Sequence, residues 1–255
     1  MNAWKRKEVI GDCTLFLGDA MEIMPTLDKC DLCVSDVPYK LTTGGRSKSN
    51  KTMSGIFASH NYANDGQLVM ATVPFSEMMT AIYGVLKDDA DCYIMSNDKN
   101  AFQLWGAALD AGFKFHNLLS WDKITLTPNR WYMKHIEFTL YLWKGAAKTI
   151  NHPESKQQLR GGERNQSDHP TEKPVDLMFE YVRNSSGAGD VVIDPFMGGG
   201  TTGVACLRSG RKFIGIELDE AHFETSLNRI QSAYDNPVMF SGCLKRTPEQ
   251  QGALL

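Results

Sequence analysis

The sequence predicts an α/β fold, a doubly wound and mostly parallel sheet of seven strands with helices on both faces. Two observations carry this prediction. Short apolar runs rich in β-branched residues alternate with longer stretches of helical period, which is typical of parallel strands joined by helices. The chain also has 255 residues, of which 42% are hydrophobic, so it can bury one sizeable core. We therefore expect residues 1–255 to form a single domain.

The predicted elements follow the apolar pattern in chain order. The predicted strands are residues 13–17, 32–35, 92–96, 117–121, 138–143, 191–194 and 213–217. The predicted helices are residues 74–87, 100–111, 175–184, 202–209 and 220–234. Two long polar segments fit neither pattern, a loop at about 42–66, which we expect to be flexible, and an insert at about 146–168. Long irregular segments in compact domains tend to be functional, so both are expected to face a substrate.

Composition and charge exclude several classes of protein. With 27 Lys and Arg against 30 Asp and Glu, the net charge of −3 argues against a protein that coats nucleic acid by charge alone. No stretch approaches the roughly 18 consecutive apolar residues of a membrane span. The basic start of the chain lacks the apolar run of a secretory signal. We therefore expect no membrane partner and a cytoplasmic location.

The six cysteines do not form a disulfide framework in a chain of this length. Cys30 and Cys33 form one CxxC, but no second pair of Cys or His stands at the spacing that a zinc site needs. This CxxC lies in an apolar run rather than at the start of a helix. We therefore interpret both residues as buried thiols of a strand, in a reducing compartment, and expect no metal site.

A glycine-rich turn between a strand and a helix is the first candidate ligand site. The predicted strand at 191–194 ends in Asp194 and is followed by Gly198, Gly199 and Gly200 and then by a helix. Such a turn lets a ligand approach backbone N–H groups at the carboxyl edge of a sheet. A P-loop does not fit because no Gly-Lys-Ser/Thr follows, whereas the GxGxxG spacing of a dinucleotide site is met. The motif alone is therefore ambiguous.

The next strand ends in an acid. Glu217 stands about 20 residues beyond the turn, where a carboxylate can accept both hydroxyls of an adenosine ribose. The alternative is an acid that caps the following helix, a role that suits Asp219 better than Glu217. Together with the glycine turn, Glu217 favours a cofactor that contains adenosine.

A second turn follows the predicted strand at 32–35. Its residues, Asp36, Val37, Pro38 and Tyr39, bring a carboxylate, a rigid proline and an aromatic ring to the edge where open α/β sheets bind ligands. A carboxylate beside backbone carbonyls and an aromatic ring suits a planar substrate with an amino group, which donates its hydrogens while its ring stacks. Taken alone, such a turn is more often structural.

Three motifs in this order resemble those of the DNA amino-methyltransferases that use S-adenosylmethionine. Residues 36–39, Asp-Val-Pro-Tyr, are similar to the Asp-Pro-Pro-Tyr catalytic motif, and residues 194–202 are similar to the Asp-Pro-Phe-x-Gly-Ser-Gly-Thr-Thr cofactor motif. Residues 169–174, His-Pro-Thr-Glu-Lys-Pro, match a third signature, just upstream of the cofactor motif in the group whose catalytic motif comes first. Val37 replaces the first proline and Gly199 replaces the serine, and the match covers most of the chain.

The resemblance implies a catalytic role for the first motif. Asp36 and the backbone carbonyl of Val37 would accept the hydrogens of an exocyclic amine. Pro38 would keep the turn rigid, and Tyr39 would stack on the base. The target base would be flipped out of the duplex at a cost of a few kcal/mol. No covalent enzyme intermediate is expected.

The resemblance also implies a set of residues that bind S-adenosylmethionine. Glu217 is implied at the ribose, and Lys173 is implied near the methionine end. The full implied set is Asp19, Thr171, Lys173, Asp194, Phe196, Gly198, Gly200, Thr201, Glu217 and Leu218.

Two basic segments border these motifs and are the expected contacts to double-stranded DNA. Residues 40–51 contain four basic residues and no acid, and residues 123–164 contain eight basic residues and three acids. Given the resemblance, we expect phosphate contacts and target recognition there rather than solvated loops. The residues expected to bind DNA are Lys40, Arg46, Lys48, Lys51, Arg130, Lys148, Lys156, Arg160 and Arg164. The insert at about 146–168 occupies the place of the target-recognition region in this group, and because it is short a homodimer is a further hypothesis.

The favoured function is a site-specific DNA methyltransferase of a prokaryotic cell or phage. Adenine N6 is the expected target because the catalytic motif begins with Asp, and cytosine N4 stays open. Methylation of RNA or of a glutamine side chain is a second hypothesis, although those enzymes usually place the cofactor motif first. A non-catalytic module that binds S-adenosylmethionine or DNA is a third. A dinucleotide oxidoreductase is a fourth, and it leaves residues 36–39 and 169–174 unexplained.

Overall fold

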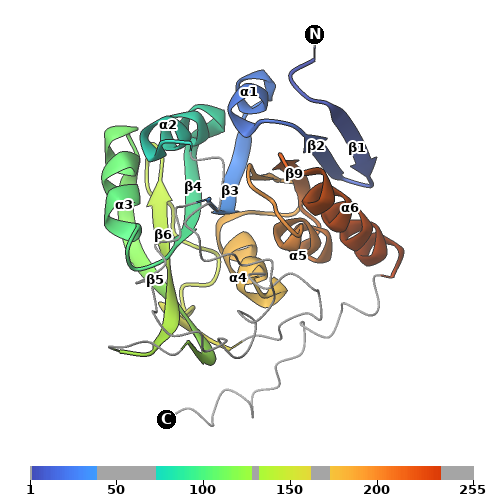
Figure 1. Cartoon of the computed structure of the whole chain (residues 1–255). Helices are drawn as coiled ribbons and strands as arrows, with labels where there is room; N and C mark the ends of the chain where they lie inside the picture. Colours follow the sequence, from blue (N-terminus) through green and yellow to red (C-terminus); the bar gives the residue numbers. More distant parts are fainter. Residues whose placement is uncertain (1, 39–72, 128–131, 162–172, 237–255) are drawn as a thin grey trace, which may run out of the picture.

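The computed structural model describes residues 2–38, 73–127, 132–161 and 173–236 (Figure 1). The strands are β1 (Arg6–Ile10), β2 (Cys13–Leu17), β3 (Cys30–Asp36), β4 (Leu86–Ser96), β5 (Lys114–Thr127), β6 (Lys134–Trp143), β7 (Gln158–Arg160), β8 (Val191–Asp194) and β9 (Lys212–Glu217). The helices are α1 (Ala20–Ile23), α2 (Phe75–Val85), α3 (Ala101–Asp110), α4 (Val175–Ser185), α5 (Thr201–Ser209) and α6 (Glu220–Asp235), with a short 3-10 helix at Met24–Thr26.

The strands form one nine-stranded sheet in the order β1-β2-β9-β8-β3-β4-β6-β5-β7. The pairings from β2 through to β4 are parallel, and β7 is parallel to β5. β1 is antiparallel to β2, and β6 is antiparallel to both β4 and β5. The predicted α/β class with a mostly parallel sheet is confirmed, and each of the seven predicted strands is present.

The sequence does not predict β1, β7 or α1. β1 lies at one edge of the sheet and alternates exposed and covered positions, with charged side chains at Arg6, Lys7 and Glu8, so it lacks an apolar run. β7 has only three residues, Gln-Leu-Arg, and α1 is a single turn. The helix predicted to reach residue 87 ends at Val85, because Leu86 already adopts the extended conformation and begins β4.

Helices cover both faces of the sheet (Figure 1). Side chains of α4, α5 and α6 form one buried apolar cluster with the sheet, and side chains of α1, α2 and α3 form the other. Within β3, Leu32 and Val34 belong to the first cluster and Cys33 to the second, which is the period of two expected for a strand buried on both faces. This is the doubly wound arrangement that the sequence predicts.

The carboxyl ends of the parallel strands lie along one edge of the sheet. Asp19 follows β2, Glu217 ends β9, Asp194 ends β8 and Asp36 ends β3. Since β2, β9, β8 and β3 are successive neighbours, these four acids stand in a row. Ligands of open α/β sheets bind outside this edge.

The CxxC cysteines are buried in the sheet. Cys30 and Cys33 lie in β3 with free thiols, as predicted, and Cys13 is a third buried free thiol. Burial raises the pKa of Cys13 and of Cys30 to about 12, so these thiols stay protonated at neutral pH. In the described part of the chain, no helix has the length and apolar character needed to span a bilayer.

Candidate active site

Asp194 is a buried carboxylate at the end of β8 that accepts hydrogen bonds from residues on both sides of the glycine turn. It is 3% exposed, and its Oδ1 accepts hydrogen bonds from Ser35 Oγ at 2.6 Å and from Phe196 N at 3.2 Å. Its Oδ2 accepts a hydrogen bond from Thr202 Oγ1 at 2.7 Å. Burial raises the pKa of Asp194 to about 6 against the opposing effect of these donors, and the charge of Asp36 adds to the rise.

The glycines of the turn are required where the backbone has positive φ. Gly198 has φ of +48° and Gly200, the N-cap of α5, has φ of +75°. A Cβ on Gly200 would lie 2.9 Å from Ser226 Cβ on α6, closer than two carbon atoms pack. The chain therefore makes a tight turn over α6 and presents its backbone at the carboxyl edge of the sheet.

Arg229 on α6 also forms hydrogen bonds with this turn. Its Nη1 donates hydrogen bonds to Gly199 O at 3.0 Å and to Thr201 Oγ1 at 2.9 Å. The position where the resembling motif has serine thus contributes its backbone carbonyl here. The predicted site residue Thr201 is buried and held inside the protein.

Glu217 joins the end of β9 to the glycine turn. Its Oε2 accepts a hydrogen bond from Gly198 N at 3.0 Å, and its Oε1 accepts hydrogen bonds from Leu218 N and Asp219 N, both at 2.9 Å. The alternative role as a helix cap belongs to Asp219, whose carboxylate accepts from His222 N at 2.9 Å at the start of α6. Glu217 is thus placed at the strand edge and not used as a helix cap.

The other implied cofactor residues flank Glu217. Gly18 N donates to Glu217 O at 2.9 Å, which brings the end of β2 and the next residue, Asp19, beside the end of β9. Asp19 caps α1 by accepting a hydrogen bond from Met21 N at 2.8 Å. Leu218 is 47% exposed, so it offers an apolar surface beside Glu217.

Asp36 forms an ion pair with Lys173, which precedes the N-cap of α4. Lys173 Nζ also lies 3.2 Å from Glu137 Oε2 on β6, and Glu137 Oε1 lies 3.0 Å from Lys123 Nζ on β5. Burial alone would raise the pKa of Glu137, but the charges of Lys173 and Lys123 outweigh it and the pKa is lowered. The resemblance implies Lys173 near the methionine end of the cofactor, and the structure brings its ammonium to Asp36.

The described part of the catalytic motif continues from β3 to Pro38. Val37 is 2% exposed and packs in the apolar cluster of α1, α2 and α3, so it anchors the turn by burial where a proline would stiffen it. Several predicted residues lie outside the described residues: Tyr39, Lys40, Arg46, Lys48, Lys51, Arg130, Arg164 and Thr171. The loop predicted at about 42–66 and the end of the insert from residue 162 also lie outside them.

Of the predicted DNA contacts that the structure describes, Arg160 lies on the side of the sheet where the parallel strands have their carboxyl ends, the side that carries Asp36. It ends β7, which is parallel to β5, and β5 runs in the same direction as β3 and β4. Lys156 is exposed and precedes β7. Lys148 is exposed and follows β6, whose antiparallel course carries the chain toward the opposite edge. The structure therefore does not bring Lys148 together with Asp36.

Three basic residues of the segment 123–164 are paired with other groups of the protein, Lys123 and Lys144 in largely buried positions and Lys134 at the surface. Lys123 pairs with Glu137, and Lys134 pairs with Asp98 at 2.8 Å. Lys144 Nζ donates to the backbone oxygen of Leu86 at 2.8 Å and is largely buried. The surplus of basic residues in this segment therefore overstates the positive charge that it presents to solvent.

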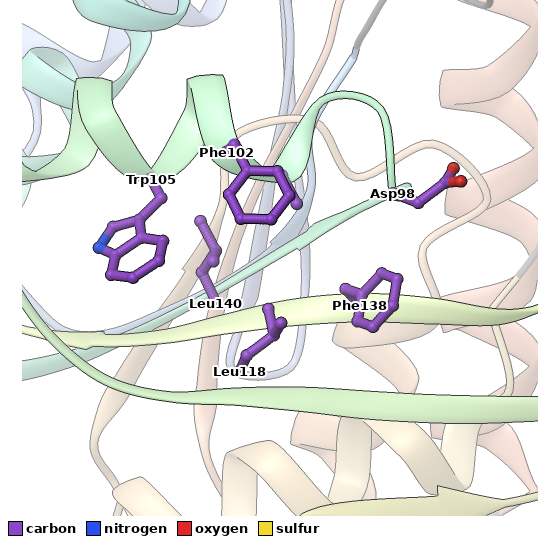
Figure 2. A pocket seen from close by; sticks show the side chains of 7 residues that line it. Asp98, Phe102, Trp105, Leu118, Phe138 and Leu140 are labelled. Atoms are coloured by element: carbon purple, nitrogen blue, oxygen red, sulfur yellow. The ribbon is translucent and has the colours of Figure 1, made fainter.

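An apolar pocket of about 140 Å³ lies between α3 and strands β5 and β6 (Figure 2). Its described lining consists of Asp98, Ala101, Phe102, Trp105, Leu118, Phe138 and Leu140. Figure 2 shows Phe102 and Trp105 projecting from the helix toward Leu118 and Leu140 on the strands. None of these residues is a predicted site residue.

Four residues that shape the site are not predicted from the sequence. Ser35, Arg229 and Glu137 act through partners distant in the sequence, whereas Lys123 pairs with Glu137 on the adjacent strand β6. Of the four, only Ser35 stands beside a motif, directly before Asp36. A polar residue inside an apolar strand, such as Ser35, is the one signal that marks a buried hydrogen bond in advance.

A family model described as DNA methylase, of the N6/N4 methyltransferase type, matches residues 30–228. The chain belongs to this family. The methylase is 25% identical over 238 residues to the Type II methyltransferase M2.MboI of Moraxella bovis, a match that covers 86% of the chain and 85% of that protein. Its structure is similar to that of the M1.HpyAVI–SAM complex, with a TM-score of 0.64, 25% identity and coverage of 85% of the chain and 99% of that chain. The PvuII DNA methyltransferase (cytosine-N4-specific) shares the fold, with a TM-score of 0.69 at 15% identity over 91% of the methylase and 95% of that chain.

These findings confirm the resemblance that the three motifs indicate. The methylase is a DNA amino-methyltransferase with the α/β fold of that class, and its cofactor is S-adenosylmethionine.

Proposed function

We propose that the methylase transfers a methyl group from S-adenosylmethionine to N6 of an adenine flipped out of double-stranded DNA. The observation that carries this proposal is the row of strand ends, in which Asp36 on β3 stands next to Asp194 and the glycine turn of β8. An ionised carboxylate accepts hydrogen bonds and donates none. It therefore suits the amino group of a flipped base, which donates hydrogen bonds. Adenine is favoured over cytosine because the catalytic motif begins with Asp.

The residues at this edge fit the cofactor. Glu217 accepts three backbone hydrogen bonds, and a carboxylate has about four acceptor positions, so one remains for a ribose hydroxyl. Leu218 offers exposed apolar surface to the adenine, and Gly200 keeps the backbone close. When bound, S-adenosylmethionine supplies a methyl group activated by the positive charge of its sulfonium.

Asp36 and the backbone carbonyl of Val37 activate the amine. Its lone pair is delocalised into the ring, and two acceptors on its hydrogens draw the nitrogen toward a tetrahedral shape. Tyr39, which lies outside the described residues, would stack on the base and help to align the lone pair with the methyl group. The nitrogen loses a proton when the new bond forms. The Asp36 carboxylate takes it and releases it to solvent, since this side chain is 32% exposed.

One assay tests both the activity and the role of Asp36. Labelled S-adenosylmethionine is offered to duplex DNA, RNA and protein, with the parent methylase and with Asp36→Ala. We expect label on duplex DNA from the parent and none from the variant. Label on RNA or protein instead, or undiminished labelling by Asp36→Ala, contradicts the proposal. Sequencing that detects modified bases then distinguishes N6-methyladenine from N4-methylcytosine.

The biological setting follows the relatives. M2.MboI is a bacterial Type II methyltransferase, which supports site-specific modification of DNA inside a prokaryotic cell or by a phage. Residues 1–255 are proposed to form one catalytic domain with the insert at about 146–168 as its recognition element. Because that element is short, we propose that the methylase acts as a homodimer, and the mass of the particle in solution, with and without DNA, tests this.

A further inference from the structure

A chain of four charged side chains leads from the strand edge into the protein, in the order Asp36, Lys173, Glu137 and Lys123. Lys173, 7% exposed, stands between two carboxylates. We propose that Glu137 is a positioning residue, which holds the ammonium of Lys173 when the amino group of the target base displaces it from Asp36. This inference rests on the proposed function, because it takes Asp36 as the acceptor for that amino group.

Lys173 and the target base compete for one carboxylate. Lys173 Nζ donates a hydrogen bond to Asp36 Oδ2, so without DNA the acceptor already holds a nitrogen donor. A charged ammonium is a stronger donor than a neutral amine. The amino group of the base can therefore form its hydrogen bond to Asp36 only when another carboxylate neutralises the ammonium of Lys173.

Glu137 is that second carboxylate. A buried ammonium that loses its counter-charge is strongly disfavoured. Glu137 Oε2 is already 3.2 Å from Lys173 Nζ, while its Oε1 is held at 3.0 Å by Lys123 Nζ. Burial opposes ionisation of Glu137, but the two ammonium groups lower its pKa, so it is charged at neutral pH. A short shift of the ammonium toward Glu137 keeps Lys173 paired with a carboxylate and frees Asp36 to accept a hydrogen bond from the amine.

Two contacts of Tyr181 join α4 to the strands beside Glu137. Tyr181 on α4 stacks on Tyr93 of β4, with centroids 4.7 Å apart and planes 10° from parallel. Its hydroxyl lies 3.1 Å from Thr139 Oγ1 on β6. Thr139 and Glu137 point to the same face of β6 because they are two residues apart. These contacts hold α4 against the face of β6 that carries Glu137, and Lys173 directly precedes the N-cap of this helix, so we infer that the adjustment takes place in the lysine side chain.

The charges around Asp36 decide whether each substitution makes ionisation of its carboxyl group easier or harder. Lys173 comes from the segment before α4, Asp194 from β8, Glu137 from β6 and Lys123 from β5. Removing the negative charge of Glu137 strengthens the hold of Lys173 on Asp36 and favours the ionised carboxylate. Removing Lys173 has the opposite effect on ionisation, since Asp36 loses its cation.

The experiment measures kcat/KM for duplex DNA against pH in the full-length methylase. In Glu137→Gln, we expect kcat/KM at neutral pH to fall by about tenfold or more, the value of one charge-assisted hydrogen bond. The acidic limb of this profile, which we attribute to ionisation of Asp36, is expected to move to lower pH. In Lys173→Met, the limb is expected to move to higher pH by roughly 1 unit. Glu137→Asp, which keeps the charge, is expected to restore most of the parent profile.

A matched control and a double variant separate positioning from folding. Glu180 on α4 is also largely buried and ion-paired, with Arg183 at 2.9 Å, and its hydrogen bonds go to Arg183 and Ser155, neither of which belongs to this chain of charges. Glu180→Gln is therefore expected to lose stability without moving the acidic limb. Adding Glu137→Gln to Lys173→Met is expected to cost little more than Lys173→Met alone, because Glu137 acts through Lys173.

Two results overturn the proposal while leaving the proposed function intact. One is a parent-like acidic limb in Glu137→Gln, and the other is a full additive loss in the double variant. Failure of the parent to methylate duplex DNA is a different result, which refutes the proposed function itself.

Discussion

Ser35 Oγ on β3 donates a hydrogen bond of 2.6 Å to Asp194 Oδ1 on β8, although the two residues are 159 positions apart in the sequence. Both side chains are buried. Ser35 immediately precedes Asp36, and Asp194 ends the strand that leads into the glycine turn. This one bond therefore links the strand proposed for catalysis to the strand proposed for the cofactor. It also stabilises a buried carboxylate whose ionisation is costly.

We expect Asp194→Asn to flatten the pH dependence of stability between about pH 4 and pH 6. Burial raises the pKa of Asp194 from 3.8 to about 6, so the folded protein keeps a proton that the unfolded chain releases in this range. The associated stabilisation is complete below the unfolded pKa and is lost as the pH rises through the folded pKa. Its size is about 3 kcal/mol. Urea denaturation at several pH values measures the difference, with the exposed Asp12→Asn as control. Equal slopes for Asp194→Asn and the parent would refute this account.

Gly200→Ala is expected to destabilise the protein by about 1–3 kcal/mol, because alanine is strained at positive φ. The new Cβ also meets Ser226 Cβ at 2.9 Å, so the start of α5 must move away from α6. We expect weaker binding of S-adenosylmethionine in calorimetric titrations. The control is Gly106→Ala on α3, where no described atom lies within 4 Å of the new Cβ. There, better helix propensity should raise stability by roughly 0.5–1 kcal/mol. Similar losses at both positions would contradict the argument.

Glu217→Gln tests the junction between β9 and the glycine turn. One amide oxygen can still accept from Leu218 N and Asp219 N, but the amide nitrogen then faces Gly198 N, and two donors repel each other. We expect the affinity for S-adenosylmethionine to fall by about tenfold or more. Isothermal titration measures it. The exposed Glu220→Gln at the start of α6 should bind the cofactor as the parent does, and equal affinities for Glu217→Gln and the parent would show that the junction is dispensable.

The centre of the sheet is predictable from the sequence, and its edges are not. β2 and β8 have the predicted bounds because their apolar residues are buried on both faces. β1 and β7 lie at the two edges, where half of the side chains meet solvent and the apolar signal is lost. The role of Asp219 as a helix cap was predictable because it depends only on residues within one turn.

The contacts that organise the site depend on partners distant in sequence. The position of Asp36 at a strand end follows from local pattern. Its ion pair with Lys173 joins residues 137 positions apart, and nothing in the spacing of either residue indicates it. Glu137 was missed for the same reason, since an acid inside a strand predicts a buried ion pair only when the facing side chain is known.

Arg160 gives the clearest test of the DNA-binding surface in the described part of the chain. It ends β7 at the same edge of the sheet as Asp36, and its side chain is 67% exposed. Its contact with Asp122, which is 17% exposed, is 3.6 Å long, and the guanidinium itself faces solvent, so it is accessible to a phosphate. Arg160→Ala is therefore expected to weaken binding to specific and non-specific duplexes alike. The slope of log affinity against log salt should decrease in magnitude by about 0.9 for one lost phosphate contact.

The control for Arg160 removes another exposed positive charge, at the opposite ends of the parallel strands. Lys87 is 50% exposed and pairs with Asp31 at 2.7 Å, near the start of β3. Lys87→Ala changes the net charge by the same amount but removes no charge near the carboxyl ends of the strands. If binding depends on overall charge alone, the two variants lose affinity equally and have the same salt dependence. If DNA lies along the edge that carries Asp36, only Arg160→Ala changes the slope, and fluorescence anisotropy at several salt concentrations distinguishes the two cases.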